Sequence, residues 1–151
     1  MLQLAQIADR EGVNALACQL HKRYVAWRPD LYTDVQELYS EADFLDAIKH
    51  RTLYLVKEGT FIAGYVRLTS ERVSRAGEKC RKTMTVSELC VDEMFLNQGL
   101  GSSIMEDVRA LARAFGCEEL QLKVYPQNDE AVSFFQKCGF TIQRIEMQMS
   151  L

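Results

Sequence analysis

The chain has 151 residues, 18 of them basic and 21 acidic, and its formal net charge is −3. This length suits one domain with a sizeable core, and 48% apolar with 26% charged residues is an ordinary globular balance. The mild acidity argues against nucleic acid as a partner, because nucleic-acid binders usually carry a basic face. No apolar run approaches the ~20 residues of a membrane span, and the N-terminus lacks the pattern of a signal peptide. We therefore expect a cytoplasmic protein without a membrane partner.

The cysteines are odd in number, and they are Cys18, Cys80, Cys90, Cys117 and Cys138. No pair has CxxC spacing, and His21 and His50 are the only histidines, so no zinc pattern emerges. We interpret the cysteines as reduced thiols and expect no metal site built by the protein.

Residues 3–4 predict a short first strand. A helical pattern begins after Asp9 and ends before Pro29, because the residue before a proline disfavours helical angles. Thr33 and Ser40 each precede a polar partner three residues later. We interpret them as successive helix N-caps, the second of which opens another helix.

A β-hairpin follows, with strands predicted over 52–57 and 61–69, because these stretches are rich in β-branched and aromatic residues. Residues 71–82 are polar and predict a loop. Residues 83–91 then predict a third strand.

Apolar residues at helical spacing over 100–115 give the strongest helix signal of the chain. Residues 120–124 alternate as a strand, Asn128 opens a helix that continues through Cys138, and residues 140–149 predict a last strand. Helices therefore interleave with strands, and the central hairpin makes the sheet mixed.

A glycine-containing loop joins the strand predicted over 83–91 to the helix predicted over 100–115. Gly99 and Gly101 let the backbone approach an anion closely, and a helix N-terminus supplies unpaired N–H groups and a positive dipole end. The loop is thus suited to a phosphate or pyrophosphate. Glycines that only ease a strand-to-helix turn are the alternative. A Walker loop does not fit, because Ser102 follows Gly101 without a lysine, and a dinucleotide fingerprint lacks its third glycine.

The strand before this loop changes phase. Met84 and Val86 are apolar on even positions, whereas Leu89 and Val91 are apolar on odd positions. A regular strand cannot bury both pairs on one face, and a bulge near Ser87–Glu88 repairs the phase. The alternative is a strand covered by helices on both faces, which needs no single phase.

Glu88 lies at this change of phase, flanked by apolar residues. A carboxylate partly withdrawn from water can act as a general base. The alternative is a glutamate on the surface of a sheet.

A fourth feature is the segment Asn128-x-x-Ala131-x-x-Phe134-Phe135, which continues to Gly139-Phe140. Together with the bulged strand, Glu88 and the glycine loop, it resembles the GNAT superfamily of acetyl-CoA-dependent N-acetyltransferases. The resemblance covers nearly the whole chain in element order. It implies an α/β (α+β) fold with a mixed, mostly antiparallel, six- to seven-stranded sheet flanked by about four helices, and a single N-acetyltransferase domain over residues 1–151.

In that family the strand before the glycine loop pairs with the pantetheine arm of acetyl-CoA, and the loop binds the pyrophosphate through backbone amides. The resemblance therefore implies acetyl-CoA as co-substrate, an amine acceptor as second partner, and no metal. Many members dimerise, so a homodimer is left open. The cofactor-binding positions that the resemblance implies are Leu89, Cys90, Val91, Leu96, Asn97, Gln98, Gly99, Leu100, Gly101, Ser102, Asn128 and Phe135.

Two residues depart from the family pattern. Leu96 stands at the usual Arg/Gln position of the glycine loop, and we expect cofactor binding to survive because backbone N–H groups make most phosphate contacts there. Phe135 stands where many members have a tyrosine that protonates the departing thiolate. Water, Tyr125 or Cys138 could replace this acid, or no acid is needed. A non-catalytic acyl-CoA-binding module is a further alternative.

The resemblance implies direct transfer of the acetyl group to a primary amine. Glu88 is expected to be the general base, and a backbone N–H near Cys90 is expected to stabilise the oxyanion. Cys90 is not expected to be an acetylated nucleophile, because no histidine lies near it in sequence.

The acceptor is expected to contact the N-terminal half of the chain. Residues 30–46 contain six acidic side chains and no lysine or arginine, so an acidic rim could attract a cationic amine. A solvated helix face is the alternative. We interpret Tyr39 as a packing residue, whereas Trp27 and Tyr32 either line the pocket or pack. A closed acceptor pocket would favour a small amine, and a wide groove would favour a protein N-terminus or lysine.

Overall fold

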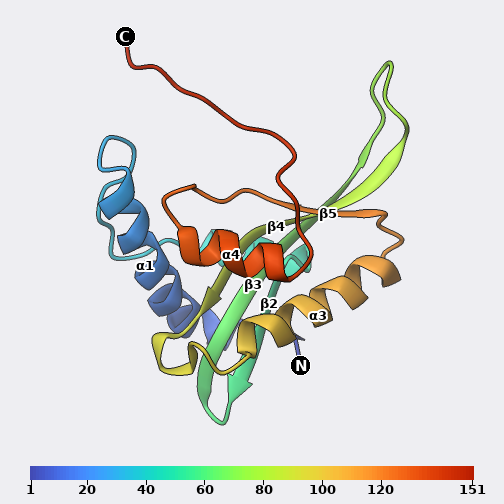
Figure 1. Ribbon diagram of the computed structural model, residues 1–151. Helices are drawn as coiled ribbons and strands as arrows, with labels where there is room; N and C mark the ends of the chain where they lie inside the picture. The colour runs from blue at the N-terminus through green and yellow to red at the C-terminus, as the bar shows by residue number, and fades with distance from the viewer.

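The computed structural model describes residues 1–151. Figure 1 shows a twisted sheet with helices around it. The elements in chain order are β1 (Gln3–Leu4), α1 (Arg10–Trp27), α2 (Glu41–Lys49), β2 (Leu53–Glu58), β3 (Phe61–Val73), β4 (Arg81–Val91), α3 (Leu100–Ala114), β5 (Glu119–Leu122) and α4 (Asp129–Lys137), with 3₁₀ turns at Ile7–Asp9 and Glu93–Phe95. The mixed α+β architecture and the four helices are confirmed.

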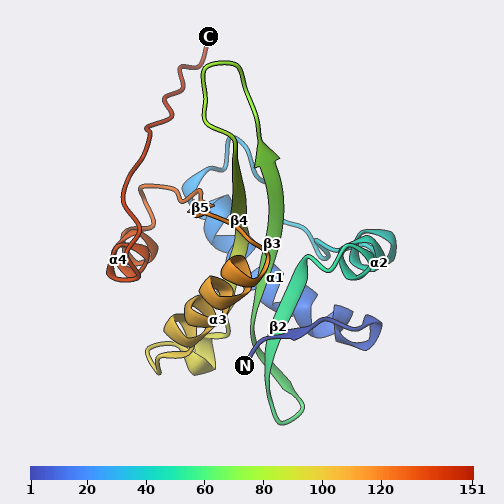
Figure 2. The same cartoon turned by 90° about the vertical axis from the view of Figure 1, so that its right-hand side faces the viewer.

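The sheet has five strands in the order β1-β2-β3-β4-β5, so the prediction of six to seven strands was wrong. Neighbouring strands are antiparallel except β4 and β5, which are parallel. Figure 2 shows α2 on one side of the edge-on sheet, with α3 and α4 on the other. No helix is both long and apolar enough to cross a bilayer.

Two hydrophobic clusters lie on opposite faces of the sheet, because successive strand residues alternate between faces. Val13, Leu16 and Phe44 of α1 and α2 pack with Leu55 of β2 in the first cluster. On the other face, Ile104 of α3 packs with Val66 of β3 and Val86 of β4 in the second cluster. The sheet is therefore fixed between two helical layers, and the site can form where its strands separate.

The hairpin of β3 and β4 is longer than predicted. Pairing continues from the core to Val73↔Arg81, so the loop predicted over 71–82 shrinks to residues 74–80. Figure 1 shows this ribbon projecting from the body of the protein. Residues 69–80 are exposed apart from Val73, so the sequence carries no burial pattern there.

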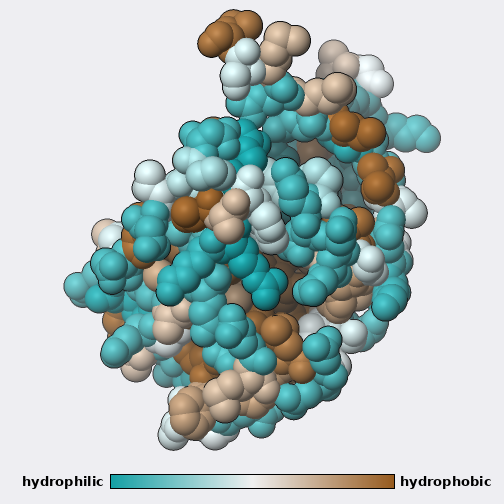
Figure 3. Space-filling model, turned by 60° about the vertical axis from the view of Figure 1, so that its left-hand side comes forward, coloured by the Kyte–Doolittle hydropathy of each residue, from teal (hydrophilic) through white to brown (hydrophobic).

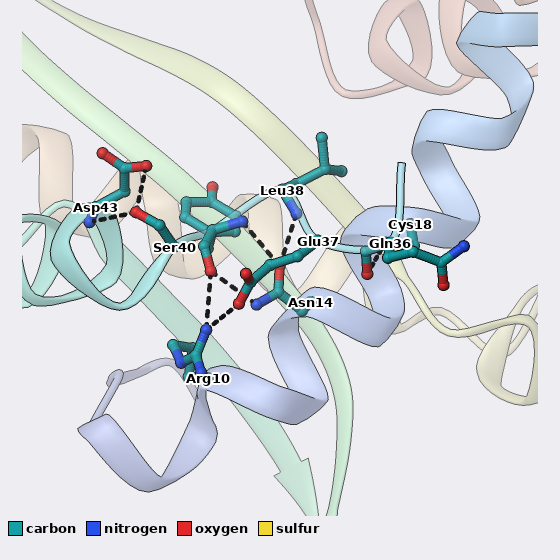
Figure 4. Close-up of polar contacts among 9 residues, drawn as sticks. Arg10, Asn14, Cys18, Gln36, Glu37, Leu38, Ser40 and Asp43 are labelled. Carbon is teal, nitrogen blue, oxygen red and sulfur yellow. Dashed lines mark hydrogen bonds and ion pairs between the residues drawn. The ribbon is translucent and has the colours of Figure 1, made fainter. Parts of the chain in front are cut away.

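Residues 33–40 do not form the helix expected from Thr33. Instead Asn14 of α1 satisfies the backbone of this segment: its Oδ1 accepts from Leu38 N (3.0 Å) and Tyr39 N (2.8 Å), and its Nδ2 donates to Tyr39 O (3.0 Å). Figure 4 shows Asn14 and Arg10 reaching toward this stretch from α1. Arg10 also forms an ion pair with Glu37. The N-cap at Ser40 is confirmed, because its Oγ accepts from Asp43 N at 3.1 Å.

The last predicted strand, over 140–149, was wrong. Residues 141–151 form no helix or strand and make no backbone–backbone hydrogen bond. Figure 1 shows this C-terminal segment leaving α4 and running away from the sheet. The alternation in the sequence is real, but a strand exists only where another strand offers its edge.

Candidate active site

Strand β4 separates from β5 at a bulge. Arg67 of β3 pairs with Glu88 and Leu68 pairs with Val86, so Ser87 is the extra residue. The bulge predicted near Ser87–Glu88 is therefore confirmed. The parallel pairing with β5 ends at Val86↔Leu122, one residue before the bulge.

The part of β4 beyond the bulge has a free edge, because only β3 pairs with it there. This edge lines a cavity of about 2270 Å³ that also reaches α1, the N-terminus of α3, and α4. In Figure 3 hydrophilic side chains dominate one face of the molecule, and apolar surface shows in the recesses between them. The predicted positions Leu89, Cys90 and Val91 all line the cavity.

The glycine loop forms a concave backbone at the start of α3. Asn97 (φ 59°) and Gly99 (φ 81°) are both left-handed, and Gly99 is the N-cap of the helix. A Cβ added to Gly99 would meet nothing within 4 Å, so open space lies above it. The N–H groups of the first helical turn lack helical acceptors, and such a concave turn suits an anion.

The loop residues named from the sequence do not all contribute in the same way. The residues that line the cavity are Leu96, Asn97, Gly99, Leu100, Gly101 and Ser102. Gln98 does not line it, and its side chain donates to Met94 O at 2.8 Å. Gln98 thus fixes the shape of the loop from its outer side.

Gly101 allows close packing of two helices. A Cβ at this position would lie 3.2 Å from Phe134 Cζ and 3.9 Å from a methyl of Val91. The second glycine of the motif therefore brings α3 against α4 and β4. A larger residue would first displace the Phe134 ring.

Glu88 is the centre of a cluster of polar side chains. Its Oε2 accepts hydrogen bonds from Tyr39 Oη at 2.9 Å and from Tyr65 Oη at 2.8 Å. Arg67, its cross-strand neighbour, places a guanidinium nitrogen 3.9 Å from Oε1. The side chain of Glu88 is 30% exposed, so the carboxylate is recessed but still reached from the cavity.

Both tyrosines remain hydrogen-bond donors. Burial raises the pKa of Tyr65 and of Tyr39 well above the usual range, and the negative charge of Glu88 adds to both shifts. Their hydroxyls therefore stay protonated and orient Oε2 of Glu88. Oε1 accepts no hydrogen bond from the protein and has the Arg67 guanidinium 3.9 Å away, so it can still meet a proton or a water molecule from the cavity.

Three tyrosines form a second cluster on the wall of the same cavity. Tyr32 Oη lies 2.6 Å from Tyr125 Oη, and the Tyr24 ring stacks on Tyr32 with 5.5 Å between centroids. The pKa of Tyr32 is raised to about 12, mainly by the hydrogen bond to Tyr125 and to a lesser extent by burial. Tyr32 and Tyr125 line the cavity, whereas Trp27 packs against Tyr24.

Cys90 lines the cavity, but its thiol is held in the first hydrophobic cluster. Its side chain is buried, and Sγ lies 3.4 Å from Leu16 O, to which the thiol donates. Burial raises the pKa of Cys90 to about 12, so the thiol stays protonated near neutral pH. A protonated, buried thiol is a poor nucleophile, which supports the expectation of direct transfer.

The two positions named on α4 have defined roles in packing and capping. Asn128 Oδ1 accepts from Ala131 N at 3.2 Å and caps the helix, so its amide nitrogen is left for a ligand. Phe135 lies between Phe134 and Phe140, with ring centroids 5.1 and 5.7 Å away. It lines the cavity, whereas Cys138 does not.

The acidic stretch over 30–46 is partly neutralised. Asp30 pairs with Arg28, Glu37 pairs with Arg10, and Asp46 lies 3.2 Å from His50. Asp43 also accepts from Ser40 Oγ at 2.7 Å, so four of the six acidic side chains are engaged in local contacts. No group of three or more His, Cys, Asp or Glu side chains is arranged to hold a metal ion.

Sequence reasoning missed the convergence of Tyr65 and Tyr39 on Glu88. Tyr39 was interpreted as a packing residue, and it is indeed buried, but its hydroxyl reaches the carboxylate. These residues lie 23 and 49 positions from Glu88, so no local pattern connects them. The only indication of this contact in the sequence is the alternation of β3, which places Tyr65 near the bulge.

Comparisons with known proteins give a consistent result. The model of the acetyltransferase (GNAT) family matches residues 3–140. A mutant of the BH1408 protein from Bacillus halodurans is 26% identical, with a TM-score of 0.94 over 100% of this chain and 99% of that chain. A search of curated proteins returned no match.

Two more distant structures share the fold. Glucosamine-6-phosphate N-acetyltransferase from Arabidopsis thaliana is 21% identical, with a TM-score of 0.71 over 99% of this chain and 97% of that chain. An aminoglycoside N-acetyltransferase in complex with CoA is 14% identical, with a TM-score of 0.73 over 100% and 99% of the two chains.

Proposed function

The chain belongs to the GNAT acetyltransferase family, and on that premise we propose that it transfers the acetyl group of acetyl-CoA directly to the primary amine of a small molecule. The observation that carries this proposal is the position of Glu88. Its carboxylate is oriented by two tyrosine hydroxyls and opens on the same cavity as the free edge of β4.

The residues present fit acetyl-CoA. The left-handed turn at Gly99 leaves open space beside unpaired helix N–H groups, which suits the pyrophosphate. The free edge of β4 offers backbone groups to an extended amide chain such as the pantetheine arm. Bound there, the cofactor would supply the acetyl thioester.

Alternation along β4 identifies the backbone groups on the free edge. Asp92 N donates to Ala63 O, and the Cys90 carbonyl lies 2.9 Å from the position of a Gly64 Cβ, so both point toward β3. Since N–H groups alternate between the two edges of a strand, those of Leu89 and Val91 point to the cavity. We assign the oxyanion-stabilising donor to this pair.

Glu88 would remove a proton from the ammonium form of the acceptor, directly or through water, which frees the nitrogen lone pair to attack the thioester carbon. The C–S bond then breaks and the electron pair stays on sulfur. The nitrogen, which becomes positively charged on attack, loses its second proton to the departing thiolate or to water. A thiol has an ordinary pKa of about 8.5, so its thiolate is a tolerable leaving group near neutral pH. Phe135 has no proton to give, and no residue is assigned as the acid.

Two further candidate functions have specific observations in their favour. The volume of the cavity, about 2270 Å³, exceeds the roughly 300–1,000 Å³ of most small-molecule sites. A large cavity favours a protein N-terminus or lysine as acceptor. Phe135 favours a non-catalytic acyl-CoA-binding module. The recessed carboxylate of Glu88 favours a compact or slender amine, so the small-molecule transferase is our first choice.

The test is release of free CoA thiol from acetyl-CoA in the presence of polyamines, aminoglycosides, amino acids and peptides. Turnover with a small amine supports the proposal. Turnover with peptides alone supports the second candidate. Tight acetyl-CoA binding without turnover across the panel contradicts both enzymatic candidates.

A further inference from the structure

Arg67 is an arginine of the cavity wall whose side chain is only loosely held by the protein. It lies opposite Glu88 in the β3–β4 register, and its nearest guanidinium nitrogen is 3.9 Å from Oε1, which is longer than a hydrogen bond. The guanidinium also lies over the Tyr39 ring, with Cζ 5.5 Å from the ring centroid. Because a guanidinium has five N–H donors and neither contact uses them well, Arg67 keeps donors for a ligand.

The arginine beside the tyrosine cluster, Arg28, is bound by its neighbours. It donates to both carboxylate oxygens of Asp30, at 2.9 and 2.7 Å, and to Gln148 Oε1 at 3.0 Å. A bidentate pair of this kind leaves little of the guanidinium for a second anion. Arg67 is therefore better suited than Arg28 to bind a negatively charged group of the acceptor.

Glu88 and Arg67 place a negative and a positive group side by side in the cavity. An amine that carries only positive charge would be attracted by Glu88 and repelled by Arg67. A free α-amino acid carries both charges, and its ammonium nitrogen and carboxylate carbon lie about 2.5 Å apart because both are bonded to one carbon. Laid across the pair, its ammonium meets Oε1 of Glu88 and its carboxylate meets the guanidinium, in charge-assisted hydrogen bonds.

The tyrosine cluster offers a wall for the rest of such an acceptor. The rings of Tyr24, Tyr32 and Tyr125 pack against one another and line the same cavity as Glu88. Burial raises the pKa of Tyr24, and the negative charge of Glu88 adds to the shift, so this ring lies within electrostatic reach of the carboxylate. An aromatic or large apolar side chain on the α-carbon would pack on these rings.

We propose that the acceptor is a free α-amino acid with an aromatic or large apolar side chain, whose carboxylate binds Arg67 while its α-amino group meets Glu88. This inference rests on the proposed function, because it names the acceptor of the same reaction, and the products are then an N-acetylamino acid and free CoA. A protein N-terminus fits less well, because its α-carboxylate is consumed in a peptide bond. A polyamine fits less well, because it brings further positive charge to Arg67.

The first experiment compares phenylalanine with phenylalaninamide, which keeps the amine and the ring but lacks the carboxylate. Arg67→Gln is expected to lower the ratio of kcat/KM for the amino acid to kcat/KM for the amide at least tenfold. The intrinsic reactivity of each amine cancels when this ratio is compared between wild type and variant. An equal loss for both acceptors would assign Arg67 only to the positioning of Glu88 and would overturn the proposal.

The matched control for this substitution is Arg72→Gln. Arg72 is an exposed arginine of the same strand that does not line the cavity, so its loss removes the same charge from β3 and should leave the ratio unchanged. A similar fall of the ratio in Arg72→Gln would attribute the effect to the overall charge of the ribbon and would contradict a carboxylate site at Arg67.

The second experiment measures binding without turnover. The protein saturated with CoA, which has no acetyl group to transfer, is titrated with phenylalanine, leucine, aspartate and phenylalaninamide in a calorimeter. Phenylalanine and leucine are expected to bind at least tenfold more tightly than aspartate, and phenylalanine at least tenfold more tightly than its amide. This comparison uses the wild-type chain, so it holds even if Arg67→Gln does not fold. Absence of amino acid binding, or equal binding of phenylalanine and its amide, overturns the proposal.

The two experiments separate this inference from the proposed function. Binding of phenylalanine to the CoA complex without acetyl transfer to any amine would contradict the proposed function and leave the amino acid site standing. Acetyl transfer confined to polyamines or aminoglycosides would support the proposed function and contradict the amino acid site.

Discussion

The hydroxyl of Tyr65 lies 2.8 Å from Oε2 of Glu88 and donates a hydrogen bond to it. Tyr65 belongs to β3 and is fully buried, whereas Glu88 follows the bulge of β4 and is partly exposed. A rigid donor inside the sheet thus orients a carboxylate that opens on the cavity. The orientation of the Glu88 carboxylate is therefore fixed by Tyr65.

Replacement of Tyr65 by phenylalanine is expected to lower kcat of acetyl transfer about tenfold, because Oε2 of Glu88 keeps only the Tyr39 donor. KM for acetyl-CoA should change little, since Tyr65 lies away from the glycine loop. The matched control is Tyr54→Phe, which alters a buried tyrosine of β2 in the other core cluster. Equal effects of the two substitutions on kcat would assign Tyr65 a purely structural role.

The stability of the protein is expected to fall above pH 10. The pKa of Tyr65 is raised by burial in the folded state, so the unfolded chain loses this proton first as pH rises through 10. The unfolded state then binds fewer protons, and the free energy of unfolding decreases with pH, by up to about 1.4 kcal/mol per pH unit for one such group. Denaturant unfolding between pH 9 and 11 should show a shallower decrease for Tyr65→Phe than for the wild type. Parallel curves would contradict this linkage.

Gly99→Ala is expected to weaken acetyl-CoA binding with a modest loss of stability. The left-handed conformation at Gly99 costs a residue with a Cβ about 1–2 kcal/mol, and the added methyl would enter the open space of the cradle. Calorimetric titration with CoA and thermal unfolding measure the two effects. Unchanged affinity would show that the cofactor does not approach this turn.

Gly101→Val is expected to act first on packing. Its Cβ would lie 3.2 Å from the Phe134 ring, so α4 must shift and the melting temperature should fall. A companion Phe134→Leu substitution should restore part of the lost stability by making room. If Gly101→Val weakened CoA binding without any loss of stability, the residue would contact the cofactor and not α4.

Cys90→Ala is expected to retain acetyl transfer within about threefold, because the thiol is buried and its pKa is raised to about 12. Alkylation at pH 8 followed by mass spectrometry should modify the exposed Cys80 quickly and leave Cys90 protected. Rapid modification of Cys90, or loss of activity in Cys90→Ala at unchanged stability, would reopen the covalent route.

Much of the fold can be predicted from the sequence, because the apolar residues that form local patterns are the residues that the core buries. Apolar spacing over 100–115 predicts α3, which buries Ile104, Met105 and Val108. The change of phase between Val86 and Leu89 predicts the bulge, because the apolar residues before and after it pack on the same face, which a regular strand does not allow. Glu88 could therefore be named as a candidate before its surroundings were known.

The other features of the site and of the sheet depend on residues that lie far apart in the sequence. Tyr65 and Tyr39 meet Glu88 only through the stacking of β3, β4 and the segment held by Asn14, which no short pattern encodes. The alternation over residues 140–149 predicts a strand that does not form, because a strand needs a partner edge and no local pattern specifies one. The sheet consequently has five strands in one chain.

The central claim is that Glu88 acts as the base in acetyl transfer to an amine. The most direct measurement compares thiol release by the wild type and by Glu88→Gln, which keeps the shape of the side chain, with acetyl-CoA affinity measured in parallel. The account predicts a loss of kcat of about 10²–10⁴ in Glu88→Gln with unchanged acetyl-CoA affinity. Turnover by Glu88→Gln at the wild-type rate, across the pH range of activity, would contradict it.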